Sequence, residues 1–157
     1  VESRAGRGTT FTILMPAIKR ETREGWHEPE SIPGGNERIL FVDDEAPIAH
    51  SGGQILERLG YSVTVRTSSI EALELFHSRP DDFDLVISDM TMPGFTGLEL
   101  ARAILPLAPD LPIILCTGGS EQLSRIKPAE AGIRSVVMKP IIVSEIALMV
   151  REILEGK

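Results

Sequence analysis

The fold of this chain is decided by an apolar run that stops on acidic residues, Ile39-Leu40-Phe41-Val42-Asp43-Asp44-Glu45. A second run of the same kind, Leu85-Val86-Ile87-Ser88, stops on Asp89. Short, continuous apolar runs are typical of buried parallel strands, and open α/β folds place their sites at the carboxyl ends of such strands. We therefore expect the two acidic strand ends to meet at one edge of a parallel sheet.

Short apolar runs alternate with amphipathic segments along residues 37–157. The predicted strands are residues 38–42, 62–66, 84–88, 112–116 and 135–138, and the predicted helices are residues 46–59, 69–78, 96–105, 120–131 and 143–155. Gly60 and Ser68 are expected to cap helices, whereas Gly52 and Gly53 fall inside one, at a cost of roughly 1 kcal/mol each. Five strand–helix units predict a doubly wound α/β fold, with a five-stranded parallel sheet covered by helices on both faces.

Composition favours an ordinary globular domain with an appendage. The chain has 157 residues, of which 42% are hydrophobic and 25% are charged, and no apolar run approaches the ~20 residues of a membrane helix. We therefore expect a cytoplasmic segment that does not insert into a membrane, even if its parent protein is membrane-anchored. The single cysteine, Cys116, excludes an internal disulfide, and a small buried apolar residue is its favoured interpretation.

The negative charge is concentrated in the part of the chain that we expect to fold. The net charge is −7; residues 1–36 carry five basic and five acidic side chains, whereas residues 37–157 carry eleven basic and eighteen acidic ones. Because the folded part would repel a phosphate backbone, we expect no direct binding to nucleic acid.

Several carboxylates at one sheet edge have a specific chemical consequence. Three ionised carboxyl groups in close proximity need a compensating cation, and hard oxygen ligands suit Mg²⁺. Asp89 is the candidate for the reactive group, since a carboxylate beside Mg²⁺ can attack a phosphoryl group. Thr117 and Lys139 follow two further strands, so a hydroxyl and a compact cation would arrive at the same edge. Each residue has an ordinary explanation alone, as a cap, a turn residue or a solvated lysine, but their joint placement favours a site.

Four motifs carry a resemblance to a known family. They are Leu40-Phe41-Val42-Asp43-Asp44-Glu45, Asp84-Leu85-Val86-Ile87-Ser88-Asp89-Met90-Thr91-Met92-Pro93-Gly94, Ile113-Ile114-Leu115-Cys116-Thr117-Gly118 and Val137-Met138-Lys139-Pro140. With these motifs at these spacings, residues 37–157 resemble the receiver domain of response regulators in two-component signal transduction. The resemblance implies a flavodoxin-like (β/α)5 fold that takes a phosphoryl group from phosphohistidine.

The resemblance also implies roles for individual residues. Asp89 would be the phospho-acceptor, and Mg²⁺ would be held by Asp43, Asp44, Asp89 and the backbone carbonyl of Thr91. Such a domain catalyses its own phosphorylation and later loses the phosphoryl group to water.

Two further residues follow from the same resemblance. Thr117 would be the hydroxyl that moves toward the phosphoryl group, and Lys139, usually followed by a cis bond to proline, would contact it. The family commonly carries Tyr or Phe three residues before the lysine, where this chain has Val136. The resemblance therefore implies phosphoryl acceptance without the usual aromatic switch, so that output would depend on loop and helix motion, for instance around residues 118–119 and Pro128.

A second resemblance covers the first sixteen residues. The turn Gly6-Arg7-Gly8-Thr9-Thr10-Phe11 and a predicted strand over residues 11–15 look like the last segment of a histidine-kinase ATP-binding domain. Residues 17–36 mix charges with Pro and Gly and are interpreted as a linker to the receiver at residues 37–157. This order is that of hybrid sensor histidine kinases. The implied partners are the kinase core, in cis or in trans, and a histidine phosphotransfer protein.

Two alternatives of other classes remain open at this point. One is a receiver-like module that docks on a partner or regulates a kinase without being phosphorylated. The other is a phosphatase with an aspartate nucleophile, which would carry a second Asp two residues after the first on its first strand. No Asp stands at position 45 or 46, so the phosphatase is the least favoured interpretation.

Overall fold

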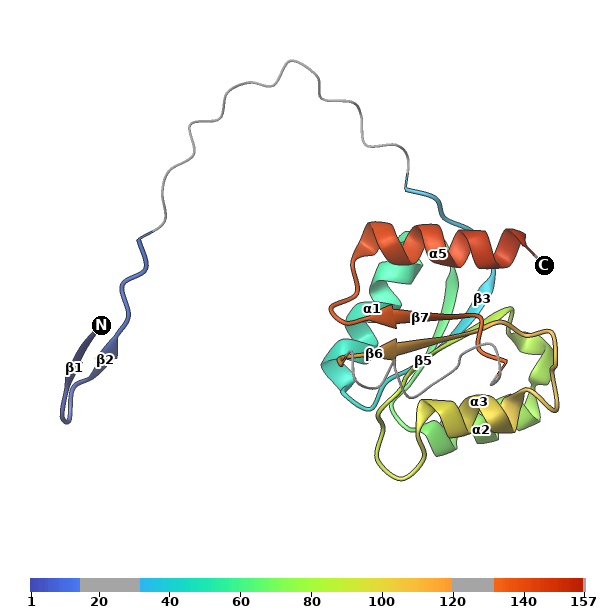
Figure 1. Ribbon diagram of the computed structural model, residues 1–157, viewed down its shortest axis with the longest axis horizontal. Helices are drawn as coiled ribbons and strands as arrows, with labels where there is room; N and C mark the ends of the chain where they lie inside the picture. Colours follow the sequence, from blue (N-terminus) through green and yellow to red (C-terminus); the bar gives the residue numbers. More distant parts are fainter. Residues whose placement is uncertain (15–31, 120–131, 157) are drawn as a thin grey trace, which may run out of the picture. The chain divides into compact units, whose positions relative to one another are not determined.

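Residues 1–14, 32–119 and 132–156 are described by the computed structural model of this chain (Figure 1). They belong to two units, Val1–Glu30 and Ser31–Lys157. The elements are β1 (Glu2–Arg4), β2 (Gly8–Thr10), β3 (Arg38–Val42), α1 (Ala46–Arg58), β4 (Ser62–Arg66), α2 (Ser69–Ser78), η1 (Pro80–Asp82), β5 (Leu85–Asp89), α3 (Gly97–Ile104), β6 (Ile113–Thr117), β7 (Ser135–Met138) and α5 (Val143–Glu155). The helix predicted over residues 120–131 lies outside the described residues.

The second unit is built on one parallel sheet. Its strand order is β4-β3-β5-β6-β7, and each neighbouring pair is parallel. The order reverses between β3 and β5, and ligands of open α/β sheets bind outside the carboxyl ends of the strands at such a point. The predicted α/β fold is confirmed.

Side chains that alternate along the strands divide the core into two halves. Strand residues point to opposite faces in turn, so Ile39 and Phe41 pack with α1 and α5, whereas Leu40 and Val42 pack with α2 and α3. Figure 1 shows the two pairs of helices on opposite sides of the sheet. Because every central strand is covered on both faces, its apolar run is continuous rather than alternating with polar residues.

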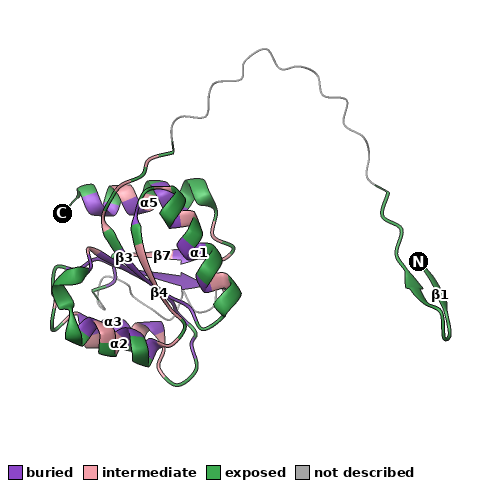
Figure 2. Ribbon diagram, turned by 180° about the vertical axis from the view of Figure 1, so that it is seen from behind, coloured by how far each residue is buried: buried purple, intermediate pink, exposed green. Residues whose placement is uncertain are grey.

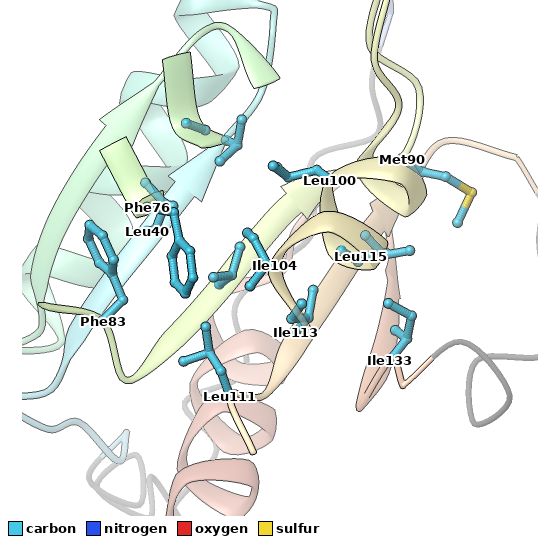
Figure 3. Close-up of a cluster of buried hydrophobic side chains, with 14 of the residues drawn as sticks. Leu40, Phe76, Phe83, Met90, Leu100, Ile104, Leu111, Ile113, Leu115 and Ile133 are labelled. Atoms are coloured by element: carbon cyan, nitrogen blue, oxygen red, sulfur yellow. The ribbon is translucent and has the colours of Figure 1, made fainter. Parts of the chain in front are cut away.

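The core on the α2 and α3 side is shown in Figure 3. Phe76 of α2 is fully buried, and its ring stacks on that of Phe83 with 6.2 Å between the centroids. Leu100 and Ile104 of α3 fill the same layer. The burial map in Figure 2 shows the central strands buried and the outer faces of the helices exposed, as expected for amphipathic helices on a sheet.

Two glycines inside α1 are explained by its packing against the sheet. A Cβ on Gly52 would lie 2.5 Å from the ring of Phe41, and a Cβ on Gly53 would lie 2.7 Å from Val65. Such distances are too short for a real contact, so the glycines let the helix approach the strands closely. Their cost in helix propensity is offset by tertiary packing that periodicity does not reveal.

Helix ends agree closely with the sequence prediction, but two strands are shifted by one residue. Ser68 caps α2 by accepting a hydrogen bond from the amide of Glu71 at 3.3 Å, and Gly60, with φ of 99°, follows α1. Strands β5 and β6 each begin and end one residue later than expected. Asp89 and Thr117 are therefore the last residues of their strands, since pairing continues through the bonds from Met90 to Cys116 and from Lys139 to Thr117.

The first unit contains a short antiparallel hairpin. Strands β1 and β2 pair Glu2 with Thr10, and Gly6 and Gly8 in and after the turn have positive φ of 76° and 87°. The expected turn is confirmed, but the strand predicted over residues 11–15 is wrong for residues 11–14, which form no strand. The hairpin register ends at Thr10, which pairs with Glu2.

Candidate functional site

Adjacent strands bring two of the predicted acids together. Asp43 follows β3 and Asp89 ends β5, and these strands pair with Val42 opposite Ser88. Both side chains are buried, with 1% and 6% of the residue exposed. Buried carboxylates are costly unless a positive charge or hydrogen bonds compensate them, so the surroundings of this pair determine what it can do.

The compensating charge is the ammonium group of Lys139. Its Nζ lies 2.7 Å from Asp43 Oδ2 and 2.6 Å from Asp89 Oδ1, which places one cation between two carboxylates. Burial lowers the pKa of Lys139, but the hydrogen bonds to both carboxylates outweigh it, so that the net shift is upward. The lysine is therefore charged at neutral pH.

Backbone amides hold the second oxygen of each carboxylate. The amide of Glu45 donates to Asp43 Oδ1 at 3.0 Å, and the amide of Thr91 donates to Asp89 Oδ2 at 2.7 Å. Each aspartate thus accepts one bond from the amide two residues later and one from Lys139. These bonds hold each carboxylate with one oxygen toward the Lys139 ammonium and the other toward a backbone amide.

Thr117 and Lys139 reach the same sheet edge on β6 and directly after β7. Cys116 pairs with Asp89, and Thr117 is the next residue toward the edge. The Thr117 side chain is buried, and its hydroxyl lies 3.3 Å from both the amide nitrogen and the carbonyl oxygen of Gly119. The amide of Lys139 donates to the Thr117 carbonyl at 2.7 Å, and the bond from Lys139 to Pro140 is cis.

The remaining predicted metal ligands lie beside this cluster. Asp44 follows Asp43 and is exposed, and Thr91, also exposed, contacts Asp89 through its amide. Within the described ranges no three acidic, His or Cys side chains are grouped tightly enough to hold a metal by themselves. The donor set of two convergent carboxylates still fits Mg²⁺, which typically takes one or two carboxylates and completes its shell with water or phosphate oxygens.

Sequence reasoning missed two features of the site. The contact between Lys139 and Asp43 joins residues 96 positions apart, and no local pattern signals it. The second feature is the close approach of α3, where a Cβ on Gly97 would lie 2.1 Å from the carbonyl oxygen of Asp89. The capping box formed by Thr96 and Glu99 at the start of α3 could have been found from its Thr-x-x-Glu spacing.

Cys116 lies beneath the site and behaves as a core residue. It is 1% exposed and unpaired, as expected. Burial raises the pKa of its thiol to about 12, so the thiolate is not formed at neutral pH.

Comparison with known proteins identifies the family. Residues 39–151 match the response regulator receiver domain. The chain belongs to this family. The predicted receiver is confirmed, and with it a place in two-component signal transduction.

Two curated sensor proteins are similar to this receiver and extend beyond it. The sensor kinase CckA of Brucella abortus is 32% identical over 98% of this chain and 17% of its own length. The aerobic respiration control sensor protein ArcB of Escherichia coli is 30% identical over 97% of this chain and 20% of its own length. The chain thus spans about a fifth of the length of these relatives.

Solved structures of receivers share the fold. A receiver domain protein from Clostridium thermocellum superposes with a TM-score of 0.72 at 28% identity, covering 76% of this chain and 95% of the other. The response regulator TrrA of Thermotoga maritima, in complex with Mg²⁺ and BeF, gives 0.68 at 34% identity, covering 74% and 98%. Among the described residues of the present receiver, no helix has the length and apolarity needed to cross a membrane.

Val136 occupies the position where the family commonly has an aromatic residue. It is half-buried on β7 and packs against the core on the α2 and α3 side. An output mechanism based on loop and helix motion stays a prediction, and Pro128 lies outside the described residues.

Proposed function

We propose that this receiver accepts a phosphoryl group on Asp89 from a phosphohistidine. The observation that carries the proposal is the cluster at the sheet edge, where the Lys139 ammonium lies between two buried carboxylates at 2.6 and 2.7 Å. An oxygen of Asp89 attacks phosphorus, the phosphorus–nitrogen bond breaks, and the imidazole leaves and takes up a proton. Water later cleaves the acyl phosphate, which restores the carboxylate and releases inorganic phosphate.

The residues around Asp89 would lower the barrier by holding charge in place. Lys139 already touches the acceptor carboxylate, so its ammonium is positioned for the negative oxygens of the transferring group. Thr117 would supply a hydroxyl donor, and the backbone amide of Thr91 orients the carboxylate. Lys139 and the Thr91 amide already hold Asp89 before the donor arrives, which reduces reorganisation during the reaction, whereas Thr117 would move toward the phosphoryl group.

Mg²⁺ fits this site on the chemistry of its donors. Asp43, Asp44, Asp89 and the backbone carbonyl of Thr91 would hold the ion. When bound, it supplies positive charge that neutralises the phosphoryl oxygens and the carboxylates. Asp43 and Asp89 already converge on one cation, and each carboxylate oxygen can accept more than the single bond described above.

Labelling with a small phosphodonor tests the proposal. With acetyl phosphate and Mg²⁺, the native chain should gain the mass of one phosphoryl group, and hydroxylamine should remove it, as expected for an acyl phosphate. Asp89→Asn should gain none, whereas Asp110→Asn, which changes an exposed aspartate in a loop, should label like the native chain. Equal labelling of native and Asp89→Asn would exclude Asp89 as the acceptor, and no labelling of either would favour a docking module.

We further propose that the chain is part of a hybrid sensor histidine kinase, with a kinase tail at residues 1–16, a linker at residues 17–36 and the receiver at residues 37–157. The two sensor relatives align over 97–98% of this chain, whereas the response regulators ORR22 of Oryza sativa and MprA of a Mycobacterium species align over 85% and 74%. The kinase core and a histidine phosphotransfer protein are the proposed partners, in the cytoplasm.

Phosphoryl transfer from ATP tests this assignment. The 157-residue chain should not be labelled by ATP, because its sequence lacks the nucleotide-binding boxes and donor histidine of a kinase. A longer natural chain should label on histidine first and on Asp89 later. A longer chain that contains no kinase core would contradict the assignment.

A further inference from the structure

The chain that enters the receiver is attached to the folded unit before β3 begins. We call residues 34–37 the entry segment. The amide of Gly35 donates to the carbonyl of Leu59 at the end of α1 at 3.0 Å, and the amide of Ser62 donates to the carbonyl of Glu37 at 2.9 Å. Figure 1 shows this segment reaching β3 beside the C-terminal half of α5.

Arg151 of α5 holds the entry segment by its side chain. Its two terminal nitrogens donate to Glu37, at 2.6 Å to Oε1 and 3.2 Å to Oε2, and one of them also donates to the carbonyl of Gly34 at 3.3 Å. The side chains of Arg151 and Glu37 are 19% and 25% exposed. A two-point contact between a planar guanidinium and a carboxylate fixes direction as well as distance, which a surface lysine would not do. The carboxylate of Glu155, on the next turn and mostly exposed, forms an ion pair with Arg151 at 3.0 Å from Nε.

The backbone of the entry segment packs closely against its neighbours. On Gly34 a Cβ would lie 2.0 Å from the backbone carbonyl oxygen of Leu59, so this position excludes one. On Gly35 a Cβ would meet side chains, with the Glu37 carboxylate at 2.1 Å, an Arg151 nitrogen at 2.4 Å and the Tyr61 ring at 2.7 Å. A freely moving linker needs no such fit. The two glycines therefore belong to a built contact rather than to a flexible spacer.

Helix α5 connects this contact with the candidate site. It begins at Val143, four residues after Lys139, and Arg151 is eight residues further along, which at 1.5 Å per residue is about 12 Å. Ile146 and Val150 bury one face of the helix against the sheet between these two points. A packed helix moves as a body. A displacement of the N-terminal end of α5, the end nearer Lys139 in the chain, is therefore also a displacement of Arg151.

We propose that Arg151 clamps the entry segment to α5, so that the position of α5 is passed to the chain that precedes the receiver. The clamp itself is supported by the contacts of Arg151 with Glu37 and Gly34. Its response to phosphorylation rests on the proposed function, since the trigger is the phosphoryl group on Asp89 and its contact with Lys139. The physical link is helix α5 together with the two-point ion pair between Arg151 and Glu37. Through them, the sheet edge that carries the acids is connected with the opposite end of β3, where the chain enters.

Amide hydrogen exchange of the ¹⁵N-labelled chain tests the clamp. In Arg151→Gln and Glu37→Gln, exchange at Gly35 should accelerate about tenfold relative to exchange at Ile87 in the centre of the sheet. The ratio of the two rates reports local release even where a variant is less stable as a whole. Arg58→Gln, which removes an exposed arginine at the end of α1, should leave the ratio unchanged. An unchanged ratio in both clamp variants would overturn the proposal.

The same spectra test the link to the site. Mg²⁺ with beryllofluoride should shift the amide signals of Thr117 and Gly35 in the native chain, and in Arg151→Gln only that of Thr117. A shift at Thr117 without one at Gly35 in the native chain would overturn the link while leaving the proposed function intact. The absence of a shift at Thr117 would instead count against the proposed function, and the exchange ratio would still decide the clamp.

Discussion

Replacing Lys139 with methionine removes a cation that contacts both buried acids. Asp43 and Asp89 lose partners at 2.7 and 2.6 Å, and their side chains are only 2% and 7% exposed. Breaking a buried ion pair by removing one partner typically costs about 3–5 kcal/mol. Because the lysine side chain is 18% exposed and water can reach it, we expect the lower end, about 3 kcal/mol of unfolding free energy without Mg²⁺.

Urea unfolding in EDTA measures this loss. With a slope of about 1.5–2 kcal/mol per molar urea, the midpoint should fall by about 1.5–2 M. Arg134→Met, which removes an exposed arginine before β7, is the matched control and should stay within about 0.5 kcal/mol of the native chain. The double variant Asp43→Asn with Lys139→Met removes one negative charge as well, and it should recover about 1 kcal/mol or more.

Mg²⁺ provides a second measurement on the same variant. Because the carboxylates no longer hold an ammonium, added Mg²⁺ should raise the unfolding midpoint of Lys139→Met more than that of the native chain. A loss smaller than about 1 kcal/mol in EDTA would show that the lysine does not compensate the buried acids. A double variant no more stable than the single one would lead to the same conclusion.

Three further predictions concern the surroundings of the site and the core. Gly97→Ala places a Cβ 2.1 Å from the carbonyl oxygen of Asp89, so the strand end must shift; we expect a loss of about 1–3 kcal/mol and slower labelling by acetyl phosphate. Phe76→Ala empties a fully buried position and should cost about 3–5 kcal/mol in urea unfolding, with the acceptor chemistry retained in the folded fraction. Arg151 holds the pKa of Glu37 below its ordinary value of 4.5 by hydrogen bonding, so their contact adds stability that is fully present above pH 4.5 and is lost as the pH falls through the lowered value. The native chain should therefore exceed Arg151→Gln by about 1 kcal/mol at pH 7, and this difference should shrink at pH 3.5; a difference independent of pH would contradict the contact.

Elements defined by local pattern were predictable from the sequence. The helix over Ser69–Ser78 was expected at the same bounds, because Ser68 caps it and apolar residues repeat with the helical period. Strand β3 was expected at the same bounds for a similar reason, since its apolar run is interrupted by Asp43. The strand expected over residues 11–15 was wrong for residues 11–14, because alternation alone does not provide a neighbouring strand with which to pair.

Site residues were predictable as a group, but their contacts were not. The rule that parallel strands present their carboxyl ends at one edge brings Asp43, Asp89, Thr117 and Lys139 to the same region. It does not say that Lys139 contacts both acids, since that depends on strand register and on the path of the chain after β7. The roles of these residues, and of Asp44 and Thr91 in holding a metal, stay predictions.

The amino-acid sequence by itself determined the alternation of strands and helices and the edge at which the charged residues gather, because both follow from interactions between residues close together in the chain. The tertiary structure alone decided that one lysine bridges two acids and that Arg151 holds Glu37, contacts across 96 and 114 positions. Such pairs form only after the sheet and its helices have packed, so no short stretch of sequence encodes them. Gly34, Gly52 and Gly53 follow the same logic, since the space that a Cβ would need is filled by Leu59, Phe41 and Val65, which lie outside the local stretch of sequence.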